Sequence, residues 1–140
     1  SGQNTKESLV INQLKTKRIL VLINYQIPMV RNNSNVFSMR LKIARKAKKL
    51  SQERLGILAG IDEASASARM NQYETGKYAP DLLMVTKIAE VLEVPVAYFY
   101  TENNLMAEII MQLQFLTELQ QKEVLDFVNK INPNISKNDI

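Results

Sequence analysis

The sequence predicts a mainly α-helical protein with a five-helix domain over residues 39–101 and a C-terminal helical pair over residues 102–140. From position 39 onward apolar residues recur every three or four positions, the spacing of helices with one buried face. Serine, aspartate and threonine stand where helices should begin, and glycine or proline stand where they should end. The 140 residues hold neither cysteine nor histidine, so no disulfide and no zinc site on these residues shapes the fold.

Composition also limits the chemistry of the chain. Hydrophobic residues make up 46% and charged residues 23% of the sequence, which suits a globular domain. The chain lacks thiolate nucleophiles and the commonest general base, and it has no glycine-rich phosphate loop or nucleophile elbow. We therefore expect no enzyme, no cofactor and no metal. Without a secretory signal or an apolar run of membrane-spanning length, the expected setting is the cytoplasm of a bacterium or its phage.

Charge is distributed unevenly along the chain. Residues 1–38 hold five basic and one acidic residue, residues 39–80 hold nine and four, and residues 81–140 hold four and nine. A basic N-terminal part followed by an acidic C-terminal part is typical of a DNA-binding module with a separate protein-contact surface. Solubilising surface charge explains the same asymmetry equally well, so charge alone does not decide the function.

Residues 1–38 form an N-terminal extension with a different pattern. Two apolar, β-branched runs at positions 9–11 and 19–23 flank the polar break at 15–17, which predicts a β-hairpin arm. Pro28 and the polar residues 31–35 then form a linker. No Asn-Gly or Asp-Gly pair marks the turn, and Met39 is a candidate natural start. The role of the extension therefore stays open.

The first two helices of the domain are expected at residues 38–50 and 51–59. In the first, Leu41 and Ala44 fall on the inner face, while Arg40 and the lysines at 42, 46 and 49 lie on other faces. Ser51 caps the second helix by accepting a backbone N–H of its first turn. Gly60 suits the left-handed position that follows a helix. The inward stripe of the second helix comprises Leu55, Leu58 and Ala59.

The third helix is expected at residues 62–75, with Asp62 as its N-cap and Gly76 at its end. Ala66, Met70 and Tyr73 share its inner face at i, i+4 and i+7. The opposite face carries small polar side chains and one arginine, which suit contacts with the edges and phosphates of DNA. The residues of this face are Ser65, Ala68, Arg69 and Gln72.

The remaining helices are expected at 81–93, at 96–100, where Pro95 suits the first turn, and in the C-terminal segment. The inward positions of the fourth are Leu82, Val85, Ile88, Ala89 and Leu92. In the C-terminal segment, a first apolar stripe comprises Leu105, Ile109, Leu113 and Leu116. A second stripe, after the candidate cap Thr117, comprises Leu119, Val124, Leu125, Phe127 and Val128.

Taken in order, three sequence motifs resemble the phage lambda repressor and Cro-like (XRE-type) helix-turn-helix family. They are Ser51-Gln52-x-x-Leu55-x-x-x-Ala59-Gly60-Ile61, then Asn71-x-Tyr73-Glu74-x-Gly76-x-x-x-Pro80, then Lys87-Ile88-Ala89-x-x-Leu92-x-Val94-Pro95-x-x-x-Phe99. Each motif alone is weak, but the ordered set at this spacing is specific. The resemblance covers residues 39–101.

The resemblance implies a five-helix lambda-repressor-like domain whose third helix enters the major groove of DNA. It also implies that Gln52 sits against a phosphate and that Arg45 pairs with Glu74. Between Gly60 and Glu74 the chain has about four residues more than the usual family pattern, close to one helical turn. These residues either add a turn to the start of the third helix or lengthen the loop before it.

Residue chemistry on this helix predicts how DNA would be read. Gln72 can pair with adenine, Arg69 with guanine, and Ala68 can touch a thymine methyl group. The full set of expected base contacts is Ser65, Ser67, Ala68, Arg69 and Gln72. The expected phosphate contacts are Gln52, Arg54, Lys77 and Tyr78.

These patterns predict a dimeric transcription regulator, most simply a repressor, since occupying a promoter requires no catalysis. One small domain covers too little DNA for high specificity, and dimers bind two half-sites about one helical turn apart. We expect the homodimer surface on the C-terminal helices at 105–116 and 119–131, with the N-terminal hairpin as a second candidate. The alternative is an antitoxin-like interaction module that binds a protein partner through these C-terminal helices.

Overall fold

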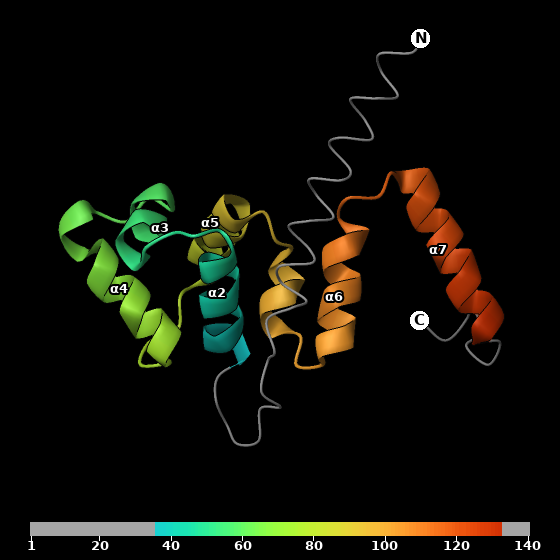
Figure 1. Ribbon diagram of the computed structural model, residues 1–140, viewed down its shortest axis with the longest axis horizontal. Coiled ribbons are helices and arrows are strands. Elements are labelled where there is room, and N and C mark those ends of the chain that lie inside the picture. The colour runs from blue at the N-terminus through green and yellow to red at the C-terminus, as the bar shows by residue number, and fades with distance from the viewer. Residues whose placement is uncertain (1–35, 133–140) are drawn as a thin grey trace, which may run out of the picture.

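The computed structural model describes residues 36–132, and every regular element in that range is helical (Figure 1). The mainly α fold class is thus confirmed, while the predicted hairpin lies outside the described residues. Within them, no helix is long and apolar enough to cross a membrane. The elements in order are α2 (Val36–Ala47), α3 (Gln52–Leu58), α4 (Glu63–Thr75), α5 (Leu82–Leu92), the 3-10 helix η1 (Val96–Tyr100), α6 (Asn104–Leu113) and α7 (Glu118–Ile131).

Local sequence signals set most of the helix ends. The side chains of Ser51 and Asp62 each accept a backbone N–H from the first turn of α3 and α4, as predicted. Asp81, which was expected as the first residue of its helix, caps α5 in the same way. Gly60 and Gly76 follow α3 and α4 with φ values of 87° and 75°, where a side chain would be strained. These short-range hydrogen bonds and dihedral requirements explain why the sequence locates the helices well.

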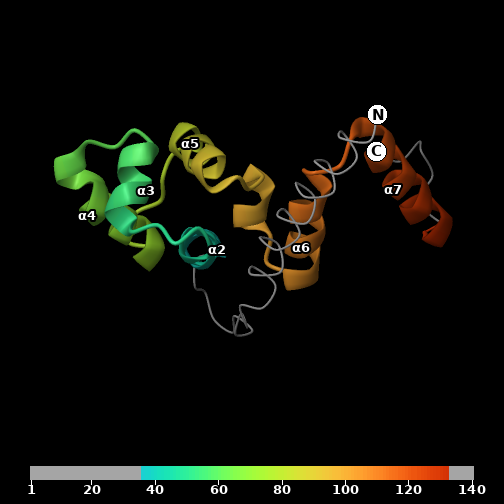
Figure 2. The same ribbon diagram turned by 45° about the horizontal axis from the view of Figure 1, so that its top comes forward.

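One hydrophobic core joins α2, α3, α4, α5 and η1, and α6 packs against one side of it through Ala107 and Met111. Phe37 of α2 and Phe99 of η1 meet there with their ring centroids 5.2 Å apart. Figures 1 and 2 show α4 at one end of the molecule and α7 at the other. The main core residues are Leu41, Leu55, Ala66, Met70, Val85, Ile88, Leu92 and Phe99.

Three predictions about helix ends and faces were wrong. The first helix spans Val36–Ala47 rather than 38–50, so it starts inside the segment assigned to the extension. Leu58 is 46% exposed and Leu82 is 71% exposed, although both were placed in the core. Each stands at the tip of its helix, Leu58 as the last residue of α3 and Leu82 as the first of α5. Periodicity identifies a stripe but not the point along it where the core stops.

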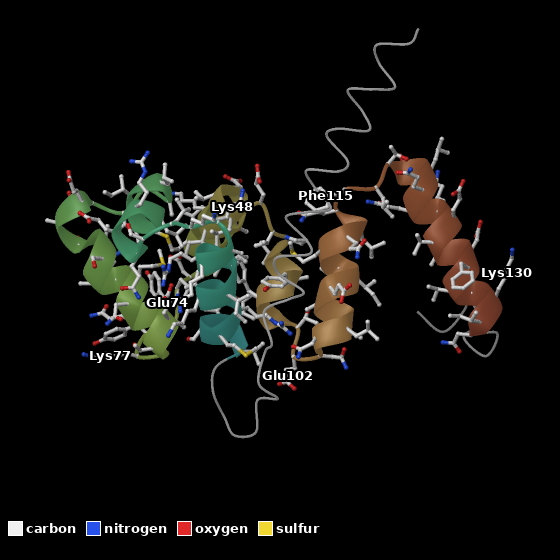
Figure 3. All side chains as sticks on the ribbon, in the orientation of Figure 1. Lys48, Glu74, Lys77, Glu102, Phe115 and Lys130 are labelled. Carbon is white, nitrogen blue, oxygen red and sulfur yellow. The ribbon has the colours of Figure 1, made fainter. Side chains whose placement is uncertain are left out.

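Arg40 departs most from its prediction: its spacing placed it off the inner face of the helix, and it is only 1% exposed. Its guanidinium donates to the carbonyl oxygens of Thr101, at 2.8 and 3.0 Å, and of Glu102, at 3.0 Å. It also donates to Asn104 Oδ1 and lies 5.3 Å from the ring centre of Tyr98. These acceptors offset the cost of burying the charge. Arg40 therefore ties α2 to the junction between η1 and α6, where Figure 3 labels Glu102.

Candidate nucleic-acid interface

Helices α3 and α4, joined by a short turn, present one face of α4 to solvent. Ala66 and Met70 are fully buried and Tyr73 is 8% exposed, so these three side chains hold the inner side of α4 against the core. The hydroxyl of Ser38 in α2 donates to the carbonyl oxygen of Tyr73 at 2.6 Å. The outer side of α4 is left without packing at one end of the molecule (Figure 1).

Gly56 permits the close approach of α3 and α4. A Cβ atom at this position would lie 2.8 Å from Ala66 Cβ and 3.0 Å from the Ala66 carbonyl oxygen. Both distances are shorter than normal contacts, and one of them involves backbone that cannot swing aside. No role was predicted for Gly56, although a glycine inside a predicted helix often marks such an approach.

An ion pair locks the C-terminal part of α4 to α2. Arg45 donates to both carboxylate oxygens of Glu74, from Nε to Oε1 and from Nη2 to Oε2 at 3.0 Å. The two side chains are 11% and 3% exposed, and Figure 3 labels Glu74 in the space between α4 and α2. The hydrogen bond to Glu74 raises the pKa of Arg45, while burial opposes that rise. The pair fixes the orientation of α4 on the domain.

Gln52 joins the same network at the start of α3. Its side-chain N–H donates to Glu74 Oε2 at 2.9 Å, and the residue is half-buried. The same nitrogen also donates to Asn71 Oδ1 at 3.5 Å, so α4 orients the amide. Only the N–H groups of this amide can donate to a phosphate oxygen, because its own oxygen is an acceptor. Arg45 also donates to the carbonyl oxygen of Leu50, so the loop before α3 is held by the same group.

The predicted base-reading residues occupy the solvent side and the edges of α4. Ser67, Ala68 and Arg69 are exposed, while Ser65 and Gln72 are half-buried. Asn71 was not predicted as a base contact, although it is also exposed and stands three positions after Ala68. Asparagine is a preferred partner of adenine, so its residue type and its spacing from Ala68 could have identified it.

The additional residues before Glu74 extend the helix rather than the loop. Helix α4 begins at Glu63 and has 13 residues, with Asp62 as its cap. The Asp62 carboxylate accepts the N–H of Ala64 at 3.1 Å. A full turn moves each side chain along the axis while keeping its face. The negative charges of Asp62 and Glu63 stand at the N-terminal end of the helix, where the helix dipole favours them.

The predicted phosphate-contacting side chains also reach solvent. Arg54 is exposed in the first turn of α3. Lys77 and Tyr78 are exposed in the loop after α4, with Lys77 Nζ 5.8 Å from the centre of the Tyr78 ring. Figure 3 labels Lys77 at the C-terminal end of α4. A hydroxyl and an ammonium placed together suit a phosphate oxygen.

Comparison with known proteins gives the class of this site. A helix-turn-helix family model matches residues 41–99, which include α3, α4 and the core around them. The crystal structure of the transcriptional regulator BswR is similar, with a TM-score of 0.61 and 43% sequence identity over 66% of this chain and 92% of that one. No match was found among curated proteins. The chain belongs to the helix-turn-helix family and is a DNA-binding regulator rather than an enzyme.

Proposed function

We propose that this protein is a sequence-specific, dimeric transcription regulator, acting as a repressor, whose helix α4 enters the major groove. The observation that carries the proposal is the division of α4 into a fully packed inner side and an exposed outer side, within a helix-turn-helix frame. The similarity to a transcriptional regulator supports the biological role. A repressor needs only to occupy its site, which requires no catalytic group.

Specific contacts would come from α4. Arg69 offers two parallel N–H groups to guanine O6 and N7, and Gln72 offers a donor and an acceptor to adenine. Ala68 suits a thymine methyl group, and Ser65 and Ser67 can contact several base edges. We add Asn71 to this set because its side chain is exposed on the same helix.

Phosphate contacts would place α4 in the groove. Arg54, Lys77 and Tyr78 reach solvent from the two ends of the helix-turn-helix. Gln52 stands at the N-terminus of α3, where backbone N–H groups also point outward. Such contacts carry affinity and its salt dependence but little sequence information.

The proposed homodimer would place two copies of α4 on half-sites about one helical turn apart. We assign its interface to α6 and α7, which carry exposed apolar residues such as Leu105, Leu119 and Phe127. A foreign protein bound to this surface, as in an antitoxin, is the competing function. The same apolar exposure favours this function, and co-purification of a basic protein with the chain would support it.

The DNA-binding proposal is tested by comparing variants on cognate and scrambled duplexes. The cognate site is first selected from random duplex DNA with the full chain. We expect Arg69→Ala and Gln72→Ala each to weaken cognate binding by about 1–3 kcal/mol and to relax base preference. Arg54→Ala should weaken binding to both duplexes equally, with a smaller salt dependence.

The matched control is Lys122→Ala, which removes one positive charge from α7 at the far end of the molecule. It should leave the preference for the cognate duplex unchanged. Equal losses on cognate and scrambled DNA for Arg69→Ala and Gln72→Ala would contradict base reading by α4.

A further inference from the structure

Helix α2 joins the two parts of the protein that would contact other molecules. In Figures 1 and 2 it lies between α4 on one side and α6 on the other. It contacts α4 directly, and it also contacts η1, the element that leads into α6. The orientation of α4 relative to α6 therefore depends on how each of them is fastened to α2.

Two side chains on one face of α2 hold α4. The Ser38 hydroxyl donates to the carbonyl oxygen of Tyr73 at 2.6 Å. Arg45 binds Glu74 through two hydrogen bonds. Ser38 and Arg45 are seven positions apart, a spacing that places them on the same face of a helix. Because hydrogen bonds depend on direction, α4 cannot turn or slide on α2 without losing these contacts.

Arg40 makes the corresponding contacts on the other side of α2. It is two positions after Ser38 and therefore lies about 160° around the helix from it. Its Nη2 group donates at 3.0 Å both to the carbonyl oxygen of Glu102 and to Oδ1 of Asn104, the first residue of α6. Nε and Nη2 also donate to the carbonyl oxygen of Thr101, just before Glu102, which Figure 3 labels. One planar group thus fixes the end of η1 and the start of α6 on α2.

Helix α6 is also fastened to the domain at its other end. Gln114 Nε2 donates to the carbonyl oxygen of Glu93 at 3.0 Å. Between the two ends of the helix, Ala107 and Met111 are buried against the core. Apolar contacts do not depend on direction, so they hold α6 on the core without fixing its angle. The hydrogen bonds at the two ends of α6 set that angle.

The chemistry of Arg40 suits positioning better than it suits stability. Removing a guanidinium from water is costly, and an apolar side chain of similar volume is often equally stabilising at a buried site. An apolar side chain cannot, however, donate several N–H groups in fixed directions. Arg40 is 1% exposed, and the centre of the Tyr98 ring lies 5.3 Å from its guanidinium carbon. The ring therefore shields the hydrogen bonds of Arg40 from water on that side.

We propose that Arg40 is a positioning residue, which sets the spacing between half-sites that the dimer binds best. Acting through α2, it fixes the direction of α6, part of the dimer interface assigned above, relative to α4. The inference rests on the proposed dimeric DNA binding and goes beyond it by naming a determinant of specificity that does not touch DNA. In a two-fold dimer the same contact acts in both copies, so a change in this angle moves both copies of α4.

The spacing between half-sites is a sensitive measure of this angle. One added base pair moves a half-site by about 3.4 Å along the DNA and turns it by about 34° around the axis. A dimer whose α4 and α6 are held at a fixed angle cannot follow both changes.

The test measures binding of the full chain to duplexes that carry two copies of the selected half-site, with the spacer changed in steps of one base pair. The spacing penalty is the ratio of the dissociation constant one base pair from the optimum to that at the optimum. For the wild type we expect a penalty of about tenfold, because a rigid dimer requires half-sites at a defined separation.

Two variants loosen the contact, and a third is the matched control. Arg40→Met removes the N–H donors but keeps a long apolar side chain in the core, and it should reduce the spacing penalty to under about threefold. Asn104→Ala removes one acceptor at an exposed position and leaves the helix cap Asn103 in place, so the fold is kept and the penalty should be intermediate. Lys42→Met removes the same charge at an exposed position of α2 and should keep the wild-type penalty.

A purely structural role for Arg40 would give a different result. A less stable domain binds more weakly at every spacing, and its spacing penalty stays that of the wild type. An unchanged penalty in Arg40→Met would overturn the proposal, as would an unchanged penalty in Asn104→Ala, which decides the outcome if Arg40→Met does not fold. A dimeric wild type without a preferred spacing would also overturn it.

Binding to a duplex with one half-site and the mass of the free chain are measured in parallel. Half-site binding depends on α4 and not on the angle of α6. A wild type that fails to bind one half-site, or that stays monomeric, contradicts the proposed function itself and removes the basis of this inference.

Discussion

Helices α4 and α7 stand at opposite ends of the molecule, are nearly equal in length, with 13 and 14 residues, and differ in how they are supported (Figure 1). Three side chains of α4 are buried, and Glu74 is bound to Arg45 and Gln52. No side chain of α7 is buried. A surface fixed by its own domain can read a rigid ligand such as DNA. For the surface of α7, which its own chain holds only at one end, we propose a role in protein–protein contact.

The exposed chemistry follows the same division. The outer face of α4 carries small polar residues and Arg69, which lose little by staying in water until DNA arrives. The outer face of α7 carries residues such as Phe127 and Ile131, which are 62% and 66% exposed. Contiguous apolar exposure of this kind marks an interaction site. This difference in exposed chemistry supports our proposal that the two helices contact different partners.

The largest expected effect is on the free energy of unfolding, and it is tested by breaking one ion pair in each region. Arg45→Ala should lower the free energy of unfolding by about 3–5 kcal/mol, because it leaves the carboxylate of Glu74 buried without its cation. Lys122→Ala breaks the Glu118–Lys122 pair of α7, whose side chains are 83% and 65% exposed, and should cost under about 0.5 kcal/mol. Urea denaturation measures both. Similar losses would mean that α4 is no better anchored than α7.

A second comparison uses one substitution at two leucines. Leu55→Ala opens a cavity at a residue with 0% exposure and should cost about 2–5 kcal/mol. Leu119→Ala, at 73% exposure, should cost under about 0.5 kcal/mol at a protein concentration where the chain is monomeric. Chemical denaturation at that concentration distinguishes them. A large loss from Leu119→Ala in the monomer would show that α7 packs on its own chain.

The contact between α3 and α4 gives a third, smaller effect. Gly56→Ala should gain about 0.5–1 kcal/mol of helix stability but lose about 1–3 kcal/mol by forcing α4 away from α3. We expect the loss to prevail, because the added Cβ would meet both the side chain and the backbone of Ala66. The midpoint of thermal unfolding measures the balance. Adding Ala66→Gly should restore part of the stability, and a double variant weaker than predicted by simple addition would argue against this contact.

The smallest expected effect is the pH dependence of stability that comes from Tyr98, which lies beside Arg40. Burial raises the pKa of Tyr98, and the nearby charge of Arg40 partly offsets the rise. The folded state therefore holds this proton more tightly than the unfolded state does. Protonated Tyr98 therefore stabilises the folded state fully below a pH of about 10, the ordinary pKa of tyrosine. This stabilisation is lost as the pH rises above that value.

The measurement for Tyr98 is the stability of the wild type and of Tyr98→Phe between about pH 8 and pH 11. The wild type should lose more stability over this interval than the variant, in which the titrating hydroxyl is absent. Equal losses would mean that other groups account for the alkaline instability and that burial of Tyr98 does not contribute to it.

Much of the helix pattern could be predicted because its signals are local. The Ser51 cap and the left-handed glycines at 60 and 76 involve hydrogen bonds and dihedral angles within a few residues. The spacing of Ala66, Met70 and Tyr73 predicts the inner face of α4, and all three side chains are buried in the core. Such features depend little on the rest of the fold.

The remaining features depend on contacts between distant segments. Arg40 is buried because carbonyl groups more than 60 positions later in the chain accept its N–H groups. Gly56 matters because Ala66 lies against it. Leu58 and Leu82 continue their apolar stripes beyond the edge of the core. Amphipathic spacing likewise identified α7 but contained no information about what would cover it.

Methylation interference tests the central claim, that the outer face of α4 lies in the major groove, most directly. Methylation of guanine N7 places a group in that groove, at an atom that Arg69 is expected to contact. We predict that the wild type binds poorly when one specific guanine in each half-site is methylated. Methylation of that same guanine should not change the binding of Arg69→Ala. An identical interference pattern for the wild type and Arg69→Ala, or interference confined to adenine N3 in the minor groove, would contradict the account.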